Sequence, residues 1–180
     1  MTARFITSSG TGIGKTLVTA ALAQQLRAAG RDVRAIKPVI SGFAPETAAE
    51  SDTGILLAAL GEAVTEDSVA RISPWRFAAP LAPDLAAARE RRMLELAEVV
   101  GFCRDAADAA ARDGGVLLIE GVGGVMAPMT RDATVADWMA ALAIPAILVV
   151  GSYLGAISHA LTAAEALAAR AIPLAAVGVS

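Results

Sequence analysis

The sequence predicts an α/β fold, in which a mostly parallel β-sheet carries helices on both faces. Short apolar segments alternate with helical segments along the chain, and strands connected in this way pair in parallel through right-handed crossovers. Segments such as 116–119 and 146–150 are apolar at every position, as in strands that helices cover on both sides. Hydrophobic residues make up 56% of the 180 residues, so one domain spanning 1–180 can fill its core.

The predicted strands are the short apolar runs that glycine, proline or charged residues interrupt. They are five to seven residues long, which suits strands better than buried helices. In chain order they are expected at 4–8, 33–39 (ending near Pro38), 115–120, 146–150 and 174–179.

The predicted helices are longer segments rich in alanine and leucine, several of which stop at a glycine. In chain order they are expected at 16–29 (before Gly30), 52–60 (before Gly61), 85–112 (in two pieces around Gly101), 135–142 and 157–170. Loops are expected at 41–51 and at 72–83, where three prolines stand close together.

Three chemically distinctive features stand where predicted strands end: the turn at 9–16, Lys37, and Glu120-Gly121. Ligands of open parallel sheets bind beyond the carboxyl ends of the strands. The strand order alone therefore predicts that these features share one ligand site.

The turn at 9–16 is a phosphate-binding loop. It follows a strand, is rich in glycine, ends in Gly-Lys-Thr and opens a helix, which is the P-loop context. Glycines let backbone N–H groups turn toward phosphate oxygens, and the helix N-terminus adds a positive dipole end. The nucleotide-binding residues predicted here are Thr11, Gly12, Ile13, Gly14, Lys15 and Thr16. Together with the parallel sheet and its two layers of helices, this loop predicts a P-loop NTPase-like three-layer sandwich.

The loop is a variant of the usual pattern, which places a glycine five residues before Gly14. Ser9 stands there, and the glycine nearest upstream of Gly12 is Gly10. Partition-type ATPases carry a second lysine at the position of Gly10, so this residue argues against that class.

Carboxylates at the same edge are candidate Mg²⁺ ligands beside the Thr16 hydroxyl. Glu120 follows four apolar residues, where an ionised group needs a cation, although a surface acid at a strand end is the simpler alternative. Asp52 begins a helix and is equally consistent with a plain cap. Lys37 would lie beside a transferred phosphate, unless it is one of the many solvated lysines at strand ends. The predicted metal set is Thr16, Asp52 and Glu120.

Composition excludes several other classes. Net charge is −3 without a basic run, which argues against a nucleic-acid partner. The longest apolar stretch, 138–150, is too short to span a membrane, and the N-terminus shows no targeting peptide. Cys103 is the only cysteine, so neither an intramolecular disulfide nor a cysteine-based zinc site is possible. We expect a cytoplasmic protein without membrane partners.

These pieces, in this order, resemble the dethiobiotin synthetase family over nearly the whole chain. The combination of Lys-Pro-Val-x-Ser-Gly with Glu-Gly-x-Gly-Gly is specific, whereas the P-loop alone is not. The segments that carry the resemblance are 11–16, Lys37-Pro38-Val39-Ile40-Ser41-Gly42, Ser51-Asp52, 74–83, Glu120-Gly121-Val122-Gly123-Gly124, Ala136-Asp137-Trp138 and 151–159.

The resemblance implies an ATP- and Mg²⁺-dependent closure of a cyclic urea on 7,8-diaminononanoate with CO₂. A carbamate formed on one amine takes the γ-phosphate, and the second amine then displaces phosphate. Lys15 and Lys37 would be catalytic, and Glu120, Gly121 and Gly123 would join the nucleotide site. The implied substrate-binding residues are Ser41, Pro80, Gly121, Val122, Gly123, Leu154 and Gly155, the last two meeting the substrate tail across a homodimer interface.

The sequence departs from the family at Ser8 (often glycine), at Gly10 and Gly12 (often acidic) and at Tyr153 (sometimes lysine). The family usually continues beyond the position of Ser180 with an adenine-recognition segment, which we expect 1–180 to lack. Two rival functions remain: an amidotransferase-type synthetase domain of cobalamin synthesis, and a non-enzymatic partition-type ATPase switch.

Overall fold

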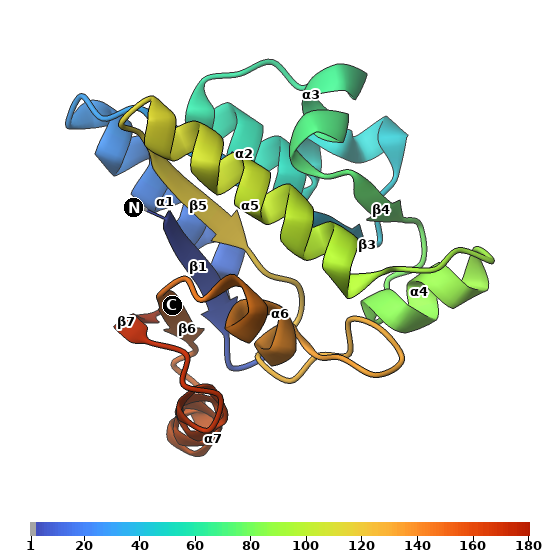
Figure 1. Ribbon diagram of the computed structural model, residues 1–180, viewed down its shortest axis with the longest axis vertical. Coiled ribbons are helices and arrows are strands. Elements are labelled where there is room, and N and C mark those ends of the chain that lie inside the picture. Colours follow the sequence, from blue (N-terminus) through green and yellow to red (C-terminus); the bar gives the residue numbers. More distant parts are fainter. Residues whose placement is uncertain (1–2) are drawn as a thin grey trace.

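A five-stranded parallel sheet forms the centre of the computed structural model, which describes residues 3–180 (Figure 1). The strand order is β2-β5-β1-β6-β7, and every neighbouring pair is parallel. All five strands fall on the predicted apolar runs: β1 (Ala3–Ser8), β2 (Val33–Ile36), β5 (Val116–Glu120), β6 (Ala146–Val150) and β7 (Leu174–Val179). Because all five strands are parallel, the carboxyl ends of β1, β2 and β5 lie at the same edge of the sheet.

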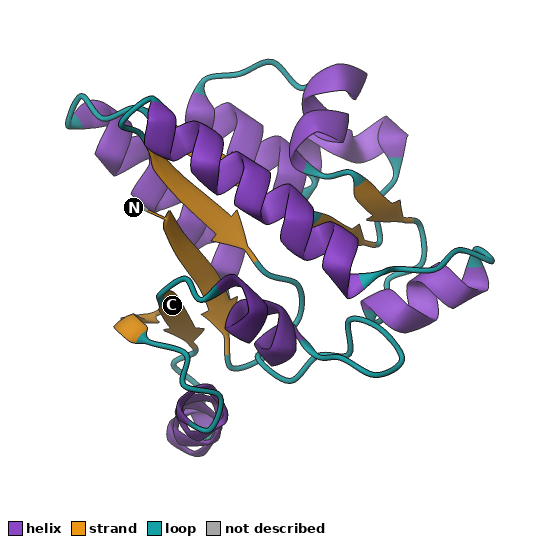
Figure 2. Ribbon diagram, in the orientation of Figure 1, coloured by secondary structure: helices purple, strands orange, loops and turns teal. Residues whose placement is uncertain are grey.

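Helices lie on both faces of this sheet, which confirms the predicted fold class (Figures 1 and 2). In the view of Figure 1, α5 crosses in front of the sheet and α1 lies behind it. The helices are α1 (Lys15–Ala28), α2 (Asp52–Leu60), α3 (Glu66–Ile72), α4 (Pro83–Arg89), α5 (Leu96–Arg112), α6 (Val135–Leu142) and α7 (Ala156–Ala168).

The predicted strand 33–39 is wrong in one respect, because the chain changes partner within it. β2 ends at Ile36, and β3 (Val39–Ser41) pairs in parallel with β4 (Trp75–Phe77) instead of with β5. Pro38 has no N–H to donate to a sheet, whereas its carbonyl accepts from Trp75 N–H at 3.1 Å. The loop predicted at 72–83 therefore contains a short strand.

The helical region predicted at 85–112 breaks at 90–95 and not at Gly101. Arg91 adopts a positive φ of 56° in that break, and Gly101 lies inside α5 where a Cβ would meet nothing within 4 Å. A glycine at such a site costs only about 1 kcal/mol, so it does not end a helix. Two further elements were not predicted: α3, and a 3₁₀ helix (Pro45–Glu50) in the loop at 41–51.

Aliphatic side chains fill the core, as the low aromatic content requires. Its largest member, Trp138 of α6, packs edge-on against Phe5 of β1 with ring centroids 4.8 Å apart. Cys103 is buried nearby, and burial raises the pKa of its thiol to about 12, which leaves it unreactive. No helix between residues 3 and 180 is long and apolar enough to cross a membrane.

The start of α6 offers a stability prediction. The Asp137 carboxylate accepts from Thr134 N–H (2.8 Å) and Thr134 Oγ (2.6 Å) and from Arg170 Nε (3.0 Å). These hydrogen bonds lower the pKa of Asp137 to about 2. Asp137→Ala should cost about 1 kcal/mol of unfolding free energy at pH 7, measured by urea denaturation.

Because a lowered carboxylate pKa stabilises the folded state only above the unfolded pKa, this difference should disappear as pH falls from about 4 to about 2. Asp108→Ala, which removes an exposed carboxylate from the middle of α5, is the matched control. Equal destabilisation by both variants would contradict the assignment.

Candidate active site

The phosphate loop connects the carboxyl end of β1 to the N-terminus of α1. Gly12 and Gly14 have φ values of 72° and 87°, a conformation that other residues rarely adopt. Gly14 is also the N-cap of α1, and no side chain caps this helix. The first N–H groups of α1 are therefore available to an anion, at the positive end of the helix dipole.

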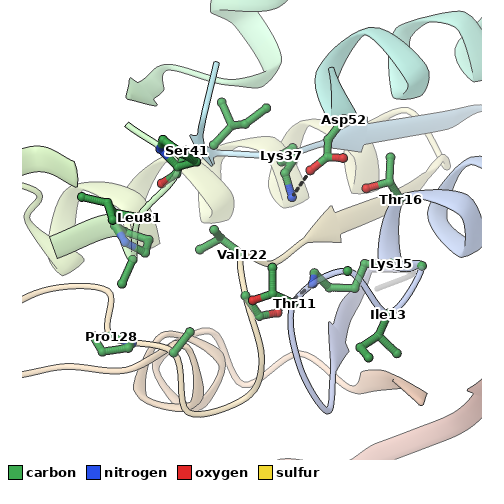
Figure 3. Close-up of a pocket in the computed structure, with 18 residues that line it drawn as sticks. Thr11, Ile13, Lys15, Thr16, Lys37, Ser41, Asp52, Leu81, Val122 and Pro128 are labelled. Carbon is green, nitrogen blue, oxygen red and sulfur yellow. Dashed lines mark hydrogen bonds and ion pairs between the residues drawn. The ribbon is translucent and has the colours of Figure 1, made fainter. Parts of the chain in front are cut away.

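A cavity of about 740 Å³ opens beside this loop, and Figure 3 shows side chains of the loop around it together with Lys37, Ser41 and Val122. This volume suits a cofactor-sized ligand. Its lining is Thr11, Gly12, Ile13, Gly14, Lys15, Thr16, Lys37, Ile40, Ser41, Asp52, Pro80, Leu81, Ala82, Pro83, Val122, Gly123, Ala127 and Pro128.

Lys37 lies at the break between β2 and β3, where its side chain is 2% exposed. Its Nζ donates to Glu120 Oε1 at 2.8 Å and to the Gly121 carbonyl at 2.9 Å, and it lies 3.2 Å from Asp52 Oδ2. Burial opposes its charge, but the two carboxylates outweigh burial and raise the pKa of Lys37. Lys37 is therefore a fixed cation at the cavity wall, which rules out the solvated alternative.

The carboxylates and Thr16 form an oxygen cluster under the phosphate loop. Thr16 Oγ donates to Glu120 Oε1 at 2.7 Å. Glu120 is fully buried, and its Oε2 has no hydrogen-bond partner among residues 3–180. Asp52 begins α2, and although partial burial opposes its charge, Lys37 and Thr16 lower its pKa. Two carboxylates and a hydroxyl are ligands that Mg²⁺ prefers, and the orphaned Oε2 fits such an ion.

Ser51, and not Asp52, caps α2, which bears on the alternative that Asp52 is a plain helix cap. Ser51 Oγ accepts from Gly54 N–H at 3.2 Å and is the N-cap of this helix. Asp52 follows as the first helical residue, and it lines the cavity. A plain capping role does not explain its position.

The Lys15 side chain contacts the glycine turn that follows β5. Its Nζ donates to the Gly123 carbonyl at 2.7 Å and to Ser8 Oγ at 3.1 Å. Burial and the neighbouring charge of Lys37 lower the pKa of Lys15 to about 8, against the opposing influence of Glu120 and Asp52. Lys15 and Lys37 are the only lysines in the chain, and both line the cavity.

The structure brings most of the predicted site residues together. Glu120 and Gly121 do not line the cavity, but both accept hydrogen bonds from Lys37, which does. Leu154 and Gly155 lie elsewhere, at the start of α7, and Leu154 is fully exposed. Four contributors were not among the predicted site residues: Ile40, Ala127 and Pro128, which line the cavity, and Ser8, which holds Lys15. Ile40 stood in a motif and Ser8 was a departure from the family, whereas Ala127 and Pro128 had no signal in the sequence.

The arrangement can bind phosphates and neutralise negative charge at one place. The loop presents backbone donors, two lysines supply fixed cations, and the oxygen cluster can hold a divalent metal. Ser41 Oγ, in the same cavity, is buried without a hydrogen-bond partner in the described part of the chain. An unsatisfied buried hydroxyl of this kind is suited to a polar ligand.

Comparison with known proteins agrees with this geometry. Residues 2–179 match a family model described as an AAA domain. The ATP-dependent dethiobiotin synthetase BioD of Methylobacterium nodulans is 57% identical, over 100% of this chain and 81% of that protein. The proteins of the same name from Acidiphilium cryptum and Anaeromyxobacter dehalogenans are 51% and 40% identical, over 96% and 95% of this chain and 77% and 73% of theirs.

Solved structures with low sequence identity share the fold alone. The signal recognition particle receptor FtsY of Elizabethkingia anophelis superposes with a TM-score of 0.55 at 14% identity, over 99% of this chain and 49% of that one. The BceF tyrosine kinase domain gives a TM-score of 0.55 at 18% identity, over 98% of this chain and 67% of that one.

Proposed function

The chain belongs to the family of ATP-dependent dethiobiotin synthetases, and we propose that it closes the cyclic urea of dethiobiotin from 7,8-diaminononanoate, CO₂ and ATP. Family membership makes it an ATP-dependent ligase of biotin biosynthesis. The observation that carries the proposal is that Lys15 and Lys37 line a single cavity, with the buried Glu120 accepting from Lys37.

The proposed reaction has three steps. One amine adds to CO₂ and loses a proton, which gives a carbamate. A carbamate oxygen attacks the γ-phosphorus of ATP, so that ADP leaves and a carbamic–phosphoric anhydride forms. The second amine attacks the carbamate carbon, loses a proton, and expels inorganic phosphate as the ring closes. The amine is itself the nucleophile, so the site needs positioning and charge neutralisation more than a strong base.

We assign the two lysines different parts of this sequence. Lys15, on the phosphate loop, would bind the terminal phosphates of ATP through Gly12–Thr16 and its own ammonium. Lys37 lies just after β2 and is held between Glu120 and Asp52; Figure 3 shows its contact with Asp52. It would therefore neutralise the charge that develops on the carbamate oxygen and the phosphoryl group during transfer.

We propose Thr16, Asp52 and Glu120 as the residues that hold Mg²⁺. When bound, Mg²⁺ supplies positive charge to the phosphates of ATP. Within residues 3–180 there is no cluster of three or more His, Cys, Asp or Glu side chains that could form a metal site without a ligand. A magnesium ion that arrives with nucleotide phosphates needs fewer protein ligands, which two carboxylates and a hydroxyl provide.

The carbamate and diamine would lie between Ser41 and the turn that follows Glu120. Ser41 offers its unpartnered hydroxyl, and the 121–124 backbone contributes further polar groups beside it. Pro80 approaches Gly42 closely, since a Cβ on Gly42 would lie 3.2 Å from Pro80 Cβ. Pro80 and Val122 thus form apolar walls suited to an alkyl chain.

A homodimer is the second part of the proposal. Ile157 and Leu161 lie one turn apart on α7 and are 78% and 61% exposed, and Leu154, in the turn just before the helix, is 103% exposed. An apolar row of this kind on a helix is typical of a protein interface. A second copy that covers this row would place Leu154 and Gly155, at the helix N-terminus, near the carboxylate tail of its partner's substrate.

Replacing Ile157 with aspartate should make the protein monomeric, because the charge would be buried in the interface. Analytical ultracentrifugation of both proteins measures the change. Met93→Asp introduces the same charge at a residue that is 79% exposed and distant in sequence, so it should remain dimeric. If the Ile157 variant sediments like the parent protein, this surface is not the interface.

ATP turnover in the presence of the substrates tests the proposed function. We expect ADP release that requires both the diamine and bicarbonate, with dethiobiotin identified by mass spectrometry. Equal ATP hydrolysis with and without the diamine would favour a partition-type switch. Stimulation by a corrinoid carboxylate would favour the cobalamin-type synthetase, which no observation in the structure supports. A cytoplasmic location, consistent with the free and buried Cys103, remains part of the proposal.

A further inference from the structure

Ser8 ends β1 directly below the phosphate loop, and its side chain is completely buried. Its Oγ donates to the Gly10 carbonyl at 2.5 Å. The Gly123 carbonyl lies 3.2 Å from the same Oγ as a second, longer acceptor. The hydroxyl has one hydrogen, which the shorter contact with Gly10 takes, so that its lone pairs face other donors. The ammonium of Lys15 donates to the same oxygen at 3.1 Å. Ser8 is thus oriented as an acceptor for the loop lysine, at a position where the family often has glycine.

The same ammonium bridges the phosphate loop and the turn at 121–124. Lys15 Nζ donates to the Gly123 carbonyl at 2.7 Å, 108 residues away in the sequence. The two segments also touch through their backbones: Val125 N–H donates to the Ser8 carbonyl at 3.0 Å, and a Cβ on Gly124 would lie 3.1 Å from Gly10 Cα. We call Ser8, Lys15 and the Gly123 carbonyl the lysine latch.

We infer that Ser8 is a positioning residue that stabilises Lys15 in the latch, and that ATP binds by drawing the ammonium out of it. A lysine has three hydrogens to donate, and two of them are satisfied by neutral oxygens in the latch. Phosphate oxygens are charged and are stronger acceptors. Each hydrogen bond that holds Lys15 in the latch therefore weakens the net affinity for ATP.

Removing the Ser8 hydroxyl should tighten nucleotide binding. For Ser8→Ala we expect the Kd of magnesium-bound AMP-PNP to fall by about three- to tenfold, as loss of one hydrogen bond of ordinary net strength in the free protein implies. Isothermal titration calorimetry without diamine measures it. Thr7→Val is the matched control, since it removes a buried hydroxyl with no partner among residues 3–180 from the adjacent position of β1. Its Kd should equal that of the parent protein.

The two-lysine composition gives a second, direct readout. Protein labelled with ¹³C only at lysine Cε has two side-chain signals, and Lys15→Ala assigns them by removing one. Ser8→Ala should shift the Lys15 signal of the nucleotide-free protein and leave that of Lys37 in place. Ser8→Thr, which keeps the hydroxyl, should restore the parent spectrum and the parent Kd.

An unchanged or increased Kd in Ser8→Ala would overturn the inference, as would a lower Kd with an unshifted Lys15 signal. If the alanine variant does not fold, Ser8→Gly removes the same hydroxyl and is subject to the same criteria. The experiment measures nucleotide binding alone and involves no turnover of the diamine. Failure to make dethiobiotin would therefore refute the proposed function without affecting this result.

Discussion

Replacing Lys37 with alanine should lower kcat for dethiobiotin formation by about 10²- to 10³-fold while changing the Kd of ATP little. Lys37 is buried between Glu120 and Asp52 and already carries its charge before substrates arrive. Such a preorganised cation stabilises the transferring phosphoryl group and the carbamate more than it stabilises bound ATP. Steady-state kinetics and nucleotide titration together separate the two parameters.

The Lys37 variant needs a control for folding, because Glu120 would then be buried without its partner. Loss of one member of a buried ion pair commonly costs about 3–5 kcal/mol of stability. The double variant Lys37→Met with Glu120→Gln removes both charges and keeps the volume, and its thermal midpoint shows whether the fold tolerates the change. An unaltered kcat in a folded Lys37→Ala protein would contradict the role assigned to this residue.

Lys15→Ala should weaken ATP binding by at least about 30-fold and lower kcat/KM by a larger factor. The loop lysine is held by Ser8 and the Gly123 carbonyl, beside the loop that we assign to the phosphates. Its loss removes an interaction with ATP in the ground state as well as during transfer. The expected contrast is that Lys15 changes Kd and kcat, whereas Lys37 changes kcat alone.

Titration of both alanine variants with magnesium-bound ATP measures this contrast. Arg34→Ala serves as a control for loss of one positive charge, since Arg34 lies on β2 in an exposed pair with Asp113. If the Lys15 variant bound ATP as tightly as the Arg34 variant, residues 10–16 would not be the site of the ATP phosphates.

Much of the fold could be predicted from local sequence. The five apolar runs became the strands of the main sheet. Of these, β1, β2, β5 and β6 are largely buried, and such strands have no polar side to disguise them, whereas the edge strand β7 is apolar but mostly exposed. The errors arose where tertiary partners decide the structure. Trp75–Phe77 forms a strand only because β3 lies beside it. Gly101 stays inside α5 because a single glycine costs a helix only about 1 kcal/mol, which the packing of the rest of the helix outweighs.

The candidate site followed from strand order more than from any single motif. Lys37, Glu120 and the phosphate loop were expected to meet because the carboxyl ends of parallel strands share an edge, and they do. The resting position of Lys15 could not be predicted. It depends on a carbonyl of the 121–124 turn, and backbone acceptors leave no signature in side-chain identity.

Transfer of oxygen from CO₂ to phosphate tests the central claim most directly, namely that ATP phosphorylates a carbamate in this cavity. A single turnover is run with CO₂ labelled with ¹⁸O at both positions, with the diamine and ATP in unlabelled water. If a carbamate oxygen attacks the γ-phosphorus, each inorganic phosphate must leave with one ¹⁸O and each dethiobiotin must keep one. Unlabelled phosphate formed alongside dethiobiotin would show that ATP was hydrolysed by water, and would contradict the account.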